Sequence, residues 1–348
     1  MNDRSIDYYK VFLRYDIQRR TRLVIITKNI LICDDSTLVH KAILRLLPED
    51  DGLNLHYAED GKAGLECLSQ HNIDVMFLDL TMPVMDGFEV LRSLPVRDYD
   101  TKIIILSADV QKQAIKRCIE LGADHFLAKP FAPEQFTTLL AELGITARSV
   151  DLSVHLAEQE LDYISIFKEV ANVALGRGAA IISDHFGEFI KMPLPNVAHM
   201  GVGELAMAIT DIKNNGNSIA IAQRFVGGGI HGEALVCLRG KDIAVFGERL
   251  GFSQMDEHKN EIVIDIANLM VSSFLVALSE QMNIPFSVRQ PIVLEEYMVW
   301  NETDDVTSEL FTVEYTYHAE SLDLECDVLF LMDSGSTQVI SKIMDTLH

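Results

Sequence analysis

Val75-Met76-Phe77-Leu78-Asp79-Leu80-Thr81-Met82-Pro83 is the most informative stretch of this 348-residue chain. Four apolar residues end in a carboxylate, and a proline soon afterwards signals a turn. Buried parallel strands show this pattern when they deliver an acid to the carboxyl edge of a sheet, where open α/β sheets bind ligands. Ile30-Leu31-Ile32-Cys33-Asp34-Asp35 repeats the pattern and ends in two acids. The two stretches predict carboxylates that meet at one edge of a sheet.

The carboxylates of Asp34, Asp35 and Asp79 would repel one another without a cation between them. Ligands that offer only oxygen suit Mg²⁺, which binds few carboxylates and keeps some of its water. We interpret Asp79 as a nucleophile that accepts a phosphoryl group, with Mg²⁺ neutralising charge during the transfer.

From Ile30 onward, short apolar runs alternate with helical patterns. Strands are expected at 30–33, 55–57, 75–78, 102–106 and 125–128. Helices are expected near 37–47, 61–69, 88–94, 111–121 and 133–143. This alternation predicts a doubly wound, five-stranded parallel sheet of flavodoxin-like α/β architecture.

Two further polar residues are expected at the edge that holds Asp79. Ser107 ends the strand at 102–106 with a hydroxyl, and Lys129 follows the strand at 125–128. A lysine at this place can pair with phosphoryl oxygens as a point charge. The bond between Lys129 and Pro130 is a candidate cis peptide.

The stretch from about Ile30 to Gly144 resembles a two-component receiver domain of the CheY type. The resemblance is based on Asp34, Asp35, Asp79, Ser107, Phe126, Lys129-Pro130 and Met82-Pro83-x-Met85-Asp86-Gly87. It implies that Asp79 takes phosphate from a histidine kinase. It also implies that the three acids, with the carbonyl of Thr81, bind Mg²⁺. Ser107 and Phe126 would move together on phosphorylation, and Lys129 would contact the phosphate.

Composition limits the other functions. A net charge of −23 argues against a nucleic-acid backbone or an anionic membrane surface as partner. Five scattered cysteines favour buried thiols in a reducing cytoplasm over disulfides or zinc. Met1–Arg22 has no apolar core, so no signal peptide is expected. Ile262–Leu278 contains Asp265 and Asn268, and we interpret it as a buried helix that falls short of a membrane span.

The second half of the chain contains an internal repeat. Glu169-Val170-Ala171-Asn172 and Asp265-Ile266-Ala267-Asn268 lie 96 residues apart, as do Pro195 and Pro291. The apolar runs at 233–237 and 329–333 have the same offset. The repeat predicts two half-units, at about 155–250 and 251–348, related by a pseudo-two-fold axis.

Each half-unit is expected to open with a helix. Glu169 and Asn172 lie three residues apart, which places a carboxylate beside a carboxamide on one helix face. Strands are expected at 219–225, 231–238, 309–317 and 324–332. We therefore expect an α/β sandwich with the two repeat helices adjacent.

This pattern resembles the CheC/CheX/FliY family of phosphatases that act on phosphorylated receivers. The resemblance implies that Asn172 and Asn268 orient a water in line with the aspartyl–phosphorus bond, and that Glu169 and Asp265 pair with the lysine of the target. The second copy departs from the family, because Asp265 replaces the glutamate and has a shorter reach.

The sequence thus predicts a cytoplasmic response regulator with an extension at 1–27, a receiver at 28–145, a linker at 146–154 and a CheC-like domain at 155–348. We expect it to hydrolyse phosphoaspartate on CheY-like receivers under the control of Asp79, and so to terminate chemotaxis signals. One alternative is a non-enzymatic adaptor that binds a flagellar or signalling partner. The other is a phosphate sink that dephosphorylates its own Asp79. Whether the chain forms a homo-oligomer stays open.

Overall fold

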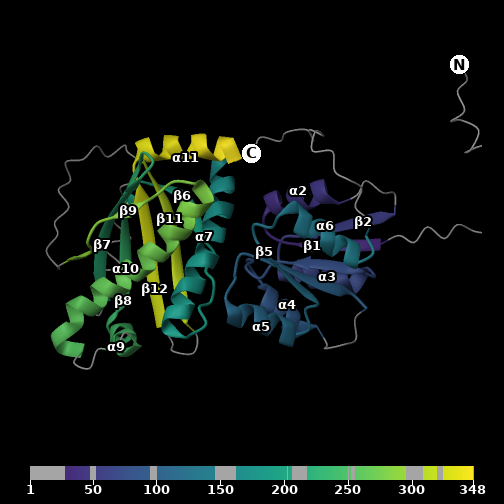
Figure 1. Ribbon diagram of the computed structural model, residues 1–348, viewed down its shortest axis with the longest axis horizontal. Coiled ribbons are helices and arrows are strands. Elements are labelled where there is room, and N and C mark those ends of the chain that lie inside the picture. The colour runs from purple at the N-terminus through teal and green to yellow at the C-terminus, as the bar shows by residue number, and fades with distance from the viewer. Residues whose placement is uncertain are drawn as a thin grey trace, which may run out of the picture.

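The structure is a computed structural model that describes residues 28–47, 52–94, 100–145, 162–201, 203–205, 218–249, 251, 255–294, 309–319 and 324–347. The expected extension at 1–27 and linker at 146–154 lie outside these ranges. Figure 1 shows two α/β units, with helix α7 on the side of the second unit that faces the first.

The first unit is the predicted parallel sheet. Its strands are β1 (Lys28–Cys33), β2 (Leu53–Ala58), β3 (Val75–Leu78), β4 (Lys102–Ser107) and β5 (His125–Ala128). Its helices are α2 (Thr37–Leu46), α3 (Gly61–Gln70), α4 (Gly87–Ser93), α5 (Lys112–Glu120) and α6 (Pro133–Glu142). All strand pairs are parallel, in the order β2-β1-β3-β4-β5. The predicted strands and helices of this unit are confirmed to within a few residues at their ends.

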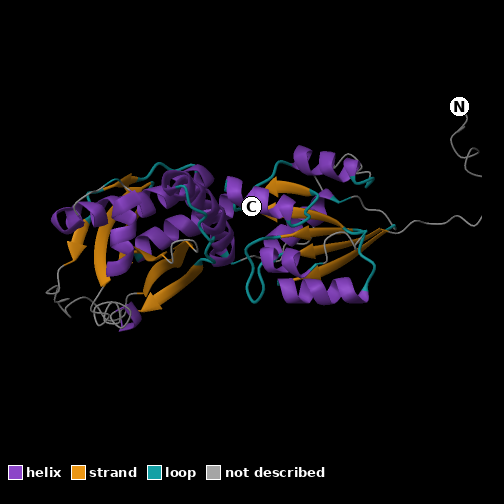
Figure 2. Cartoon of the chain, turned by 90° about the horizontal axis from the view of Figure 1, so that it is seen from below, coloured by secondary structure: helices purple, strands orange, loops and turns teal. Residues whose placement is uncertain are grey.

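The sheet of this unit is covered on both faces, as Figure 2 shows. Helices α3, α4 and α5 pack on one face around Met76 and Leu78, and α2 and α6 pack on the other around Ile32 and Phe77. Strand β3 is buried along its whole length, which explains why its sequence is a continuous apolar run. Side chains in the loops that follow the strands cap helices. Asp86, for example, forms a capping box with Glu89 at the start of α4.

The second unit is a largely antiparallel sheet with helices on one face. Its strands are β6 (Asn196–Gly201), β7 (Ser218–Gly227), β8 (Ile230–Arg239), β9 (Ser287–Val288), β10 (Ile292–Leu294), β11 (Glu309–Ala319) and β12 (Leu324–Met332). Its helices are α7 (Tyr163–Phe186), α9 (Gly240–Arg249), α10 (Met255–Met282) and α11 (Ser334–Leu347). The four predicted strands are confirmed. The predicted packing of the two repeat helices side by side is also confirmed, because Arg177 of α7 pairs with Glu280 of α10 at 2.6 Å.

The strand order β10-β7-β8-β12-β11-β6 reflects the sequence repeat. If β6 is exchanged with β10, β7 with β11 and β8 with β12, the result is the same strand order read from the opposite edge of the sheet. Helices α7 and α10 exchange in the same way, and both pack on the sheet through one apolar cluster. The predicted pseudo-two-fold axis therefore passes between β8 and β12.

Helix α10 is longer than the sequence suggested. Residues His258–Met282 have the length and mean hydropathy, 2.0, of a segment that could cross a membrane. In the 18-residue stretch with this mean hydropathy, 61% of the helix is buried inside the protein. Its apolar side chains pack against the sheet, as in the core helix of an α/β unit.

The two units are in direct contact. The Gln111 side chain donates to the carbonyl of Ile190 at 2.7 Å and accepts from the amide of Ile190 at 3.0 Å. Gly176 of α7 lies against the backbone of Ala108, so close that an added Cβ would meet the Ala108 carbonyl oxygen at 2.1 Å. Helix α7 is therefore seated on the loop that follows β4.

Candidate functional site

The acidic site lies at the carboxyl ends of β1 and β3. Asp34, Asp35 and Asp79 each offer a carboxylate oxygen within 4.8 Å of the others. Asp34 and Asp79 are buried, with 2% and 1% of their surface exposed. The strand pairing produces this cluster, because Cys33 lies opposite Leu78 and the acids follow directly. The sequence placed these three residues correctly.

Lys129 provides the counter-charge. Its ammonium lies 2.7 Å from Asp34 Oδ2 and 3.3 Å from Asp79 Oδ2. The peptide bond to Pro130 is cis, as predicted. Burial alone would lower the pKa of Lys129, but the carboxylates of Asp34, Asp79 and Glu169 hold this pKa above its ordinary value. The surrounding carboxylates therefore favour the charged form of Lys129 beside Asp79.

The carboxylates of this cluster fit Mg²⁺. Burial, the largest effect, raises the pKa of Asp79 well above its ordinary value, although Lys129 opposes the shift. Asp79 Oδ2 also forms no hydrogen bond within the described residues. The other oxygen, Oδ1, accepts from the Leu80 amide at 2.8 Å. A buried carboxylate oxygen that lacks a hydrogen bond gains from a divalent cation. Asp34, Asp35 and Asp79 would hold the ion, and Thr81 is buried two residues beyond the acceptor.

The two predicted switch residues occupy different environments. Ser107 is fully buried, and its hydroxyl accepts a hydrogen bond from the amide of Asp109 at 3.1 Å. Phe126 is half-buried and packs against the cluster under α3, α4 and α5. Ser107 ends β4, which pairs with β3, whereas Phe126 lies one strand further away, on β5.

The first repeat helix lies over this acidic site. Glu169 lies on α7 and accepts a hydrogen bond from the Ser36 hydroxyl. Burial raises the pKa of Glu169, and the ammonium of Lys129 opposes that shift. Lys168 pairs with Asp35 at 3.4 Å. The glutamate predicted to meet the lysine of a target thus lies beside a lysine of its own chain.

Asn172 completes this side of the contact. It is 6% exposed, and its Oδ1 has no hydrogen-bond partner within the described residues. A cavity of about 230 Å³ lies between α7 and the receiver beside these contacts, and its lining includes Asp35, Ser36, Glu169, Asn172 and Pro195. Its volume is enough for a phosphoryl group and a water. We call this arrangement of Glu169 and Asn172 the covered site.

The second repeat helix presents its motif differently. Asp265 and Asn268 of α10 are exposed. Gln223, buried in β7, donates from Nε2 to Asn268 Oδ1 at 3.0 Å and to the carbonyl of Arg289 at 2.9 Å. The two motifs therefore do not form one joint site. We call the arrangement of Asp265 and Asn268 the open site.

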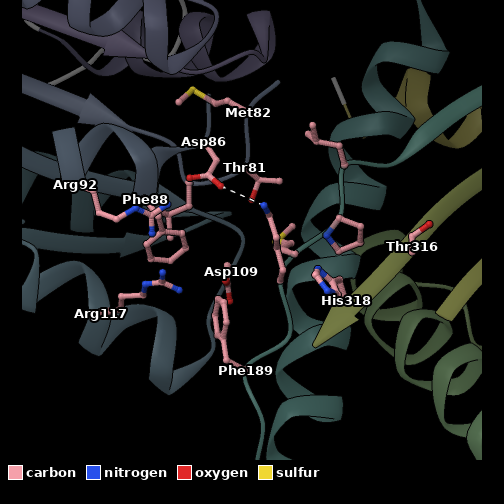
Figure 3. Close-up of a pocket in the computed structure, with 15 residues that line it drawn as sticks. Thr81, Met82, Asp86, Phe88, Arg92, Asp109, Arg117, Phe189, Thr316 and His318 are labelled. Atoms are coloured by element: carbon pink, nitrogen blue, oxygen red, sulfur yellow. Dashed lines mark ion pairs between the residues drawn. The ribbon is translucent and has the colours of Figure 1, made fainter. Parts of the chain in front are cut away.

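A further cavity of about 240 Å³ lies between the two units. Thr81 and Arg117 line it from the first unit, and Lys191 and His318 line it from the second. Arg117 lies over the rings of Phe88 and Phe189, 4.9 and 5.8 Å from their centroids, as Figure 3 shows. An ion pair of 3.6 Å joins Lys191 to Asp86 across the same space. These contacts, like those of Gln111 and Gly176, were not predicted, because no sequence pattern marks a contact between domains.

Comparisons with known proteins match the first unit. The family model described as "Response regulator receiver domain" matches residues 30–141. Transcriptional regulatory protein MalR of Bacillus subtilis is 31% identical over 135 residues, which cover 38% of this chain and 57% of MalR. One chain in the crystal structure of the CheX–CheY–BeF3–Mg²⁺ complex from Borrelia burgdorferi is 30% identical, with 34% of this chain and 90% of that chain covered and a TM-score of 0.31.

A further relative is matched over most of its own length. Response regulator MprA of Mycobacterium ulcerans is 32% identical over 173 residues, which cover 48% of this chain and 71% of MprA. The family model covers the receiver unit, whose acids, hydroxyl and lysine are in the positions described above. The chain therefore belongs to the response regulators of two-component systems, whose receiver domains take phosphate from histidine kinases.

Proposed function

We propose that the second domain is a phosphoaspartate phosphatase and that the phosphorylated receiver of its own chain is its first substrate. The observation that supports this proposal best is the position of α7. Glu169 lies beside Lys129, and Asn172 faces the cavity next to Asp35. Of the functions that the sequence left open, the phosphate sink agrees best with this geometry.

The chemistry requires little from the phosphatase domain. Mg²⁺, when bound, neutralises charge on the phosphoryl oxygens. Lys129 pairs with the same oxygens, and Glu169 fixes the position of α7 through Lys129 and Ser36. The free Oδ1 of Asn172 accepts from a water in the cavity and orients it toward phosphorus. As the water oxygen bonds to phosphorus, the bond to the Asp79 oxygen breaks. The products are the Asp79 carboxylate and inorganic phosphate, and one proton leaves to solvent.

Positioning accounts for the expected rate gain. An acyl phosphate is already activated, so neither Glu169 nor Asn172 has to act as a base. The contact would also limit phosphorylation, because Asp79 is 1% exposed and close enough to Glu169 of α7 to feel its charge. A histidine kinase reaches Asp79 only when the domains part. The protein would then drain phosphate from a kinase that other receivers share.

The open site supports a second activity, on receivers in trans. Asp265 and Asn268 are exposed on α10, where a CheY-like receiver can dock by the same pseudo-symmetry. Gln223 holds the Asn268 carboxamide, so its Nδ2 is the group left for a ligand. This activity would terminate a chemotaxis or motility signal in the cytoplasm, as the sequence suggests.

Two matched variants test the proposal. The full chain is phosphorylated on Asp79 with a small-molecule phosphodonor, and the release of inorganic phosphate is followed after the donor is removed. Asn172→Ala should lengthen the lifetime of phosphorylated Asp79 at least tenfold, which is well below the full contribution that positioning can make to a barrier. Asn268→Ala should leave this lifetime unchanged. Equal lifetimes in the wild type and Asn172→Ala would end the proposal.

The trans activity is tested with a phosphorylated CheY-like receiver as added substrate. Here Asn268→Ala should slow phosphate release and Asn172→Ala should not. A chain that retains the added receiver in a pull-down, but leaves its phosphate in place, would favour the adaptor alternative.

A further inference from the structure

A cluster of nitrogen and sulfur ligands lies on the receiver domain, apart from the acidic site. It consists of His56 on β2, Cys67 in the last turn of α3, and His71 directly after α3. One ring nitrogen of each histidine and the thiol sulfur all lie within 4.8 Å of one another. The two imidazole rings are 4.4 Å apart between centroids, with an interplanar angle of 35°.

The three side chains have no other described role. Within the described part of the chain, the two imidazole rings and the Cys67 sulfur form no hydrogen bond and no ion pair. Four of the five cysteines are buried, and Cys67 is the one that is partly accessible. His71 is exposed, so its ring is free to adjust. Three soft or borderline donors therefore share one accessible point.

We propose that His56, Cys67 and His71 form a transition-metal site of the kind that binds Zn²⁺. Imidazole and thiolate are the ligands that Zn²⁺ prefers, at roughly 2.0–2.1 Å for nitrogen and 2.3 Å for sulfur. A tetrahedral site needs donor atoms about 3.3–3.8 Å apart. The observed limit of 4.8 Å thus requires the side chains to move inward by about 1 Å. As the metal–sulfur bond forms, the thiol proton leaves to solvent, and the fourth position stays open for water or an external ligand.

The ligand chemistry separates this site from the acidic one. Asp34, Asp35 and Asp79 offer only oxygen, which favours Mg²⁺ over Zn²⁺. The metal would join edge strand β2 to the end of α3. The start of α3 is in turn tied to the loop after Asp79, because the Gly61 amide donates to the Met85 carbonyl at 3.1 Å. A metal at the far end of α3 would therefore hold in place a helix that supports this loop.

Co²⁺ is the direct probe, since it binds Zn²⁺ sites and gives absorption bands that report its ligands. Titration of the full chain should give a thiolate-to-cobalt charge-transfer band and the visible bands of tetrahedral cobalt, saturating at one ion per chain. Zn²⁺ should abolish both. Cys67→Ser should lose the charge-transfer band, and His71→Gln should weaken binding by more than roughly tenfold, the lower end of what even an outer-shell partner costs.

Two controls exclude other sites. Asp79→Asn removes a ligand of the acidic site, and His125→Gln removes an exposed histidine outside the cluster; both should retain the cobalt bands. Zn²⁺ should also raise the unfolding temperature of the wild type, but not that of Cys67→Ser. A charge-transfer band that persists in Cys67→Ser would overturn the proposal. So would the absence of bands at millimolar Co²⁺, which would leave a stacked imidazole pair and nothing more.

Discussion

Gly176→Ala should separate the two domains without changing any group that takes part in the chemistry. The new Cβ would lie 2.1 Å from the Ala108 carbonyl oxygen and 2.5 Å from its carbonyl carbon. Ordinary contact begins at 3.4 Å, so α7 and the loop must part by about 1.3 Å (3.4 − 2.1). Both partners are backbone, and neither can rotate away. The helix itself should not suffer, because alanine is better than glycine in a helix interior by about 1 kcal/mol.

The magnitude follows from the contacts that this shift breaks. The paired hydrogen bonds between Gln111 and the backbone of Ile190 are 2.7 and 3.0 Å long and cannot survive a separation of that size. Each contributes about 0.5–1.5 kcal/mol, so docking should weaken by about 2 kcal/mol. At 1.4 kcal/mol per factor of ten, this corresponds to a shift of roughly 30-fold toward the separated state.

Hydrogen exchange at Ile190 measures this equilibrium directly, because its amide is protected by Gln111 across the interface. We expect exchange roughly 30-fold faster in Gly176→Ala. We also expect longer-lived phosphate on Asp79, since the covered site would be vacated. Gly178→Ala is the matched control. It lies on the same helix, and its Cβ would face the Tyr317 hydroxyl at 3.2 Å within the second domain. Unchanged Ile190 exchange in a folded Gly176→Ala protein would refute the reasoning.

Three further outcomes are expected. Burial raises the pKa of the Asp109 carboxyl to about 6, so the folded state holds the carboxyl proton more tightly than the unfolded state does. The free energy of unfolding should therefore fall as the pH rises from about 4 to 6. Asp109→Asn should remove this pH dependence in urea unfolding and add up to about 3 kcal/mol to the free energy of unfolding at pH 7. Gln223→Ala should release the Asn268 carboxamide and slow phosphate release from an added receiver several-fold, with the lifetime of phosphorylated Asp79 unchanged. Chelation of Mg²⁺ should stop phosphorylation of Asp79 by a small phosphodonor, and restoring Mg²⁺ should recover it.

The receiver could be predicted from sequence because its features are local. A strand that ends in Asp79 has a clear pattern, and parallel pairing then brings Asp34 and Asp35 to the same edge. The repeat could be predicted because a shift of 96 residues aligns Asn172 with Asn268. The parallel sheet of the receiver, the adjacent repeat helices and the acidic cluster all follow from these two signals.

The remaining features depend on contacts that sequence spacing does not encode. Gly176 is an ordinary helix glycine until the fold places Ala108 against it. Cys67 and His71 are four residues apart, a spacing that suits metal ligands on a helix, but His56 reaches them only because β2 lies beside α3. The expectation of no zinc rested on the spacing of the cysteines and of histidines in the second half of the chain, and it did not consider His56 and His71.

The two copies of the repeat differ in what surrounds them, and this difference assigns them separate roles. The residue that lies 96 positions after Gln223 is Ala319. Alanine has no side-chain carboxamide that could hold Asn172 as Gln223 holds Asn268. Asn172 thus keeps a free Oδ1 beneath the receiver, whereas Asn268 is held ready at the surface. A receiver joined to its phosphatase in one chain has an effective concentration on the order of millimolar. A free receiver at micromolar concentration cannot displace it from α7. Under the proposed function, the covered site hydrolyses phosphate on Asp79 of the same chain, and the open site hydrolyses phosphate on other receivers. The lifetime of phosphorylated Asp79 can therefore be set independently of the rate at which other receivers lose their phosphate.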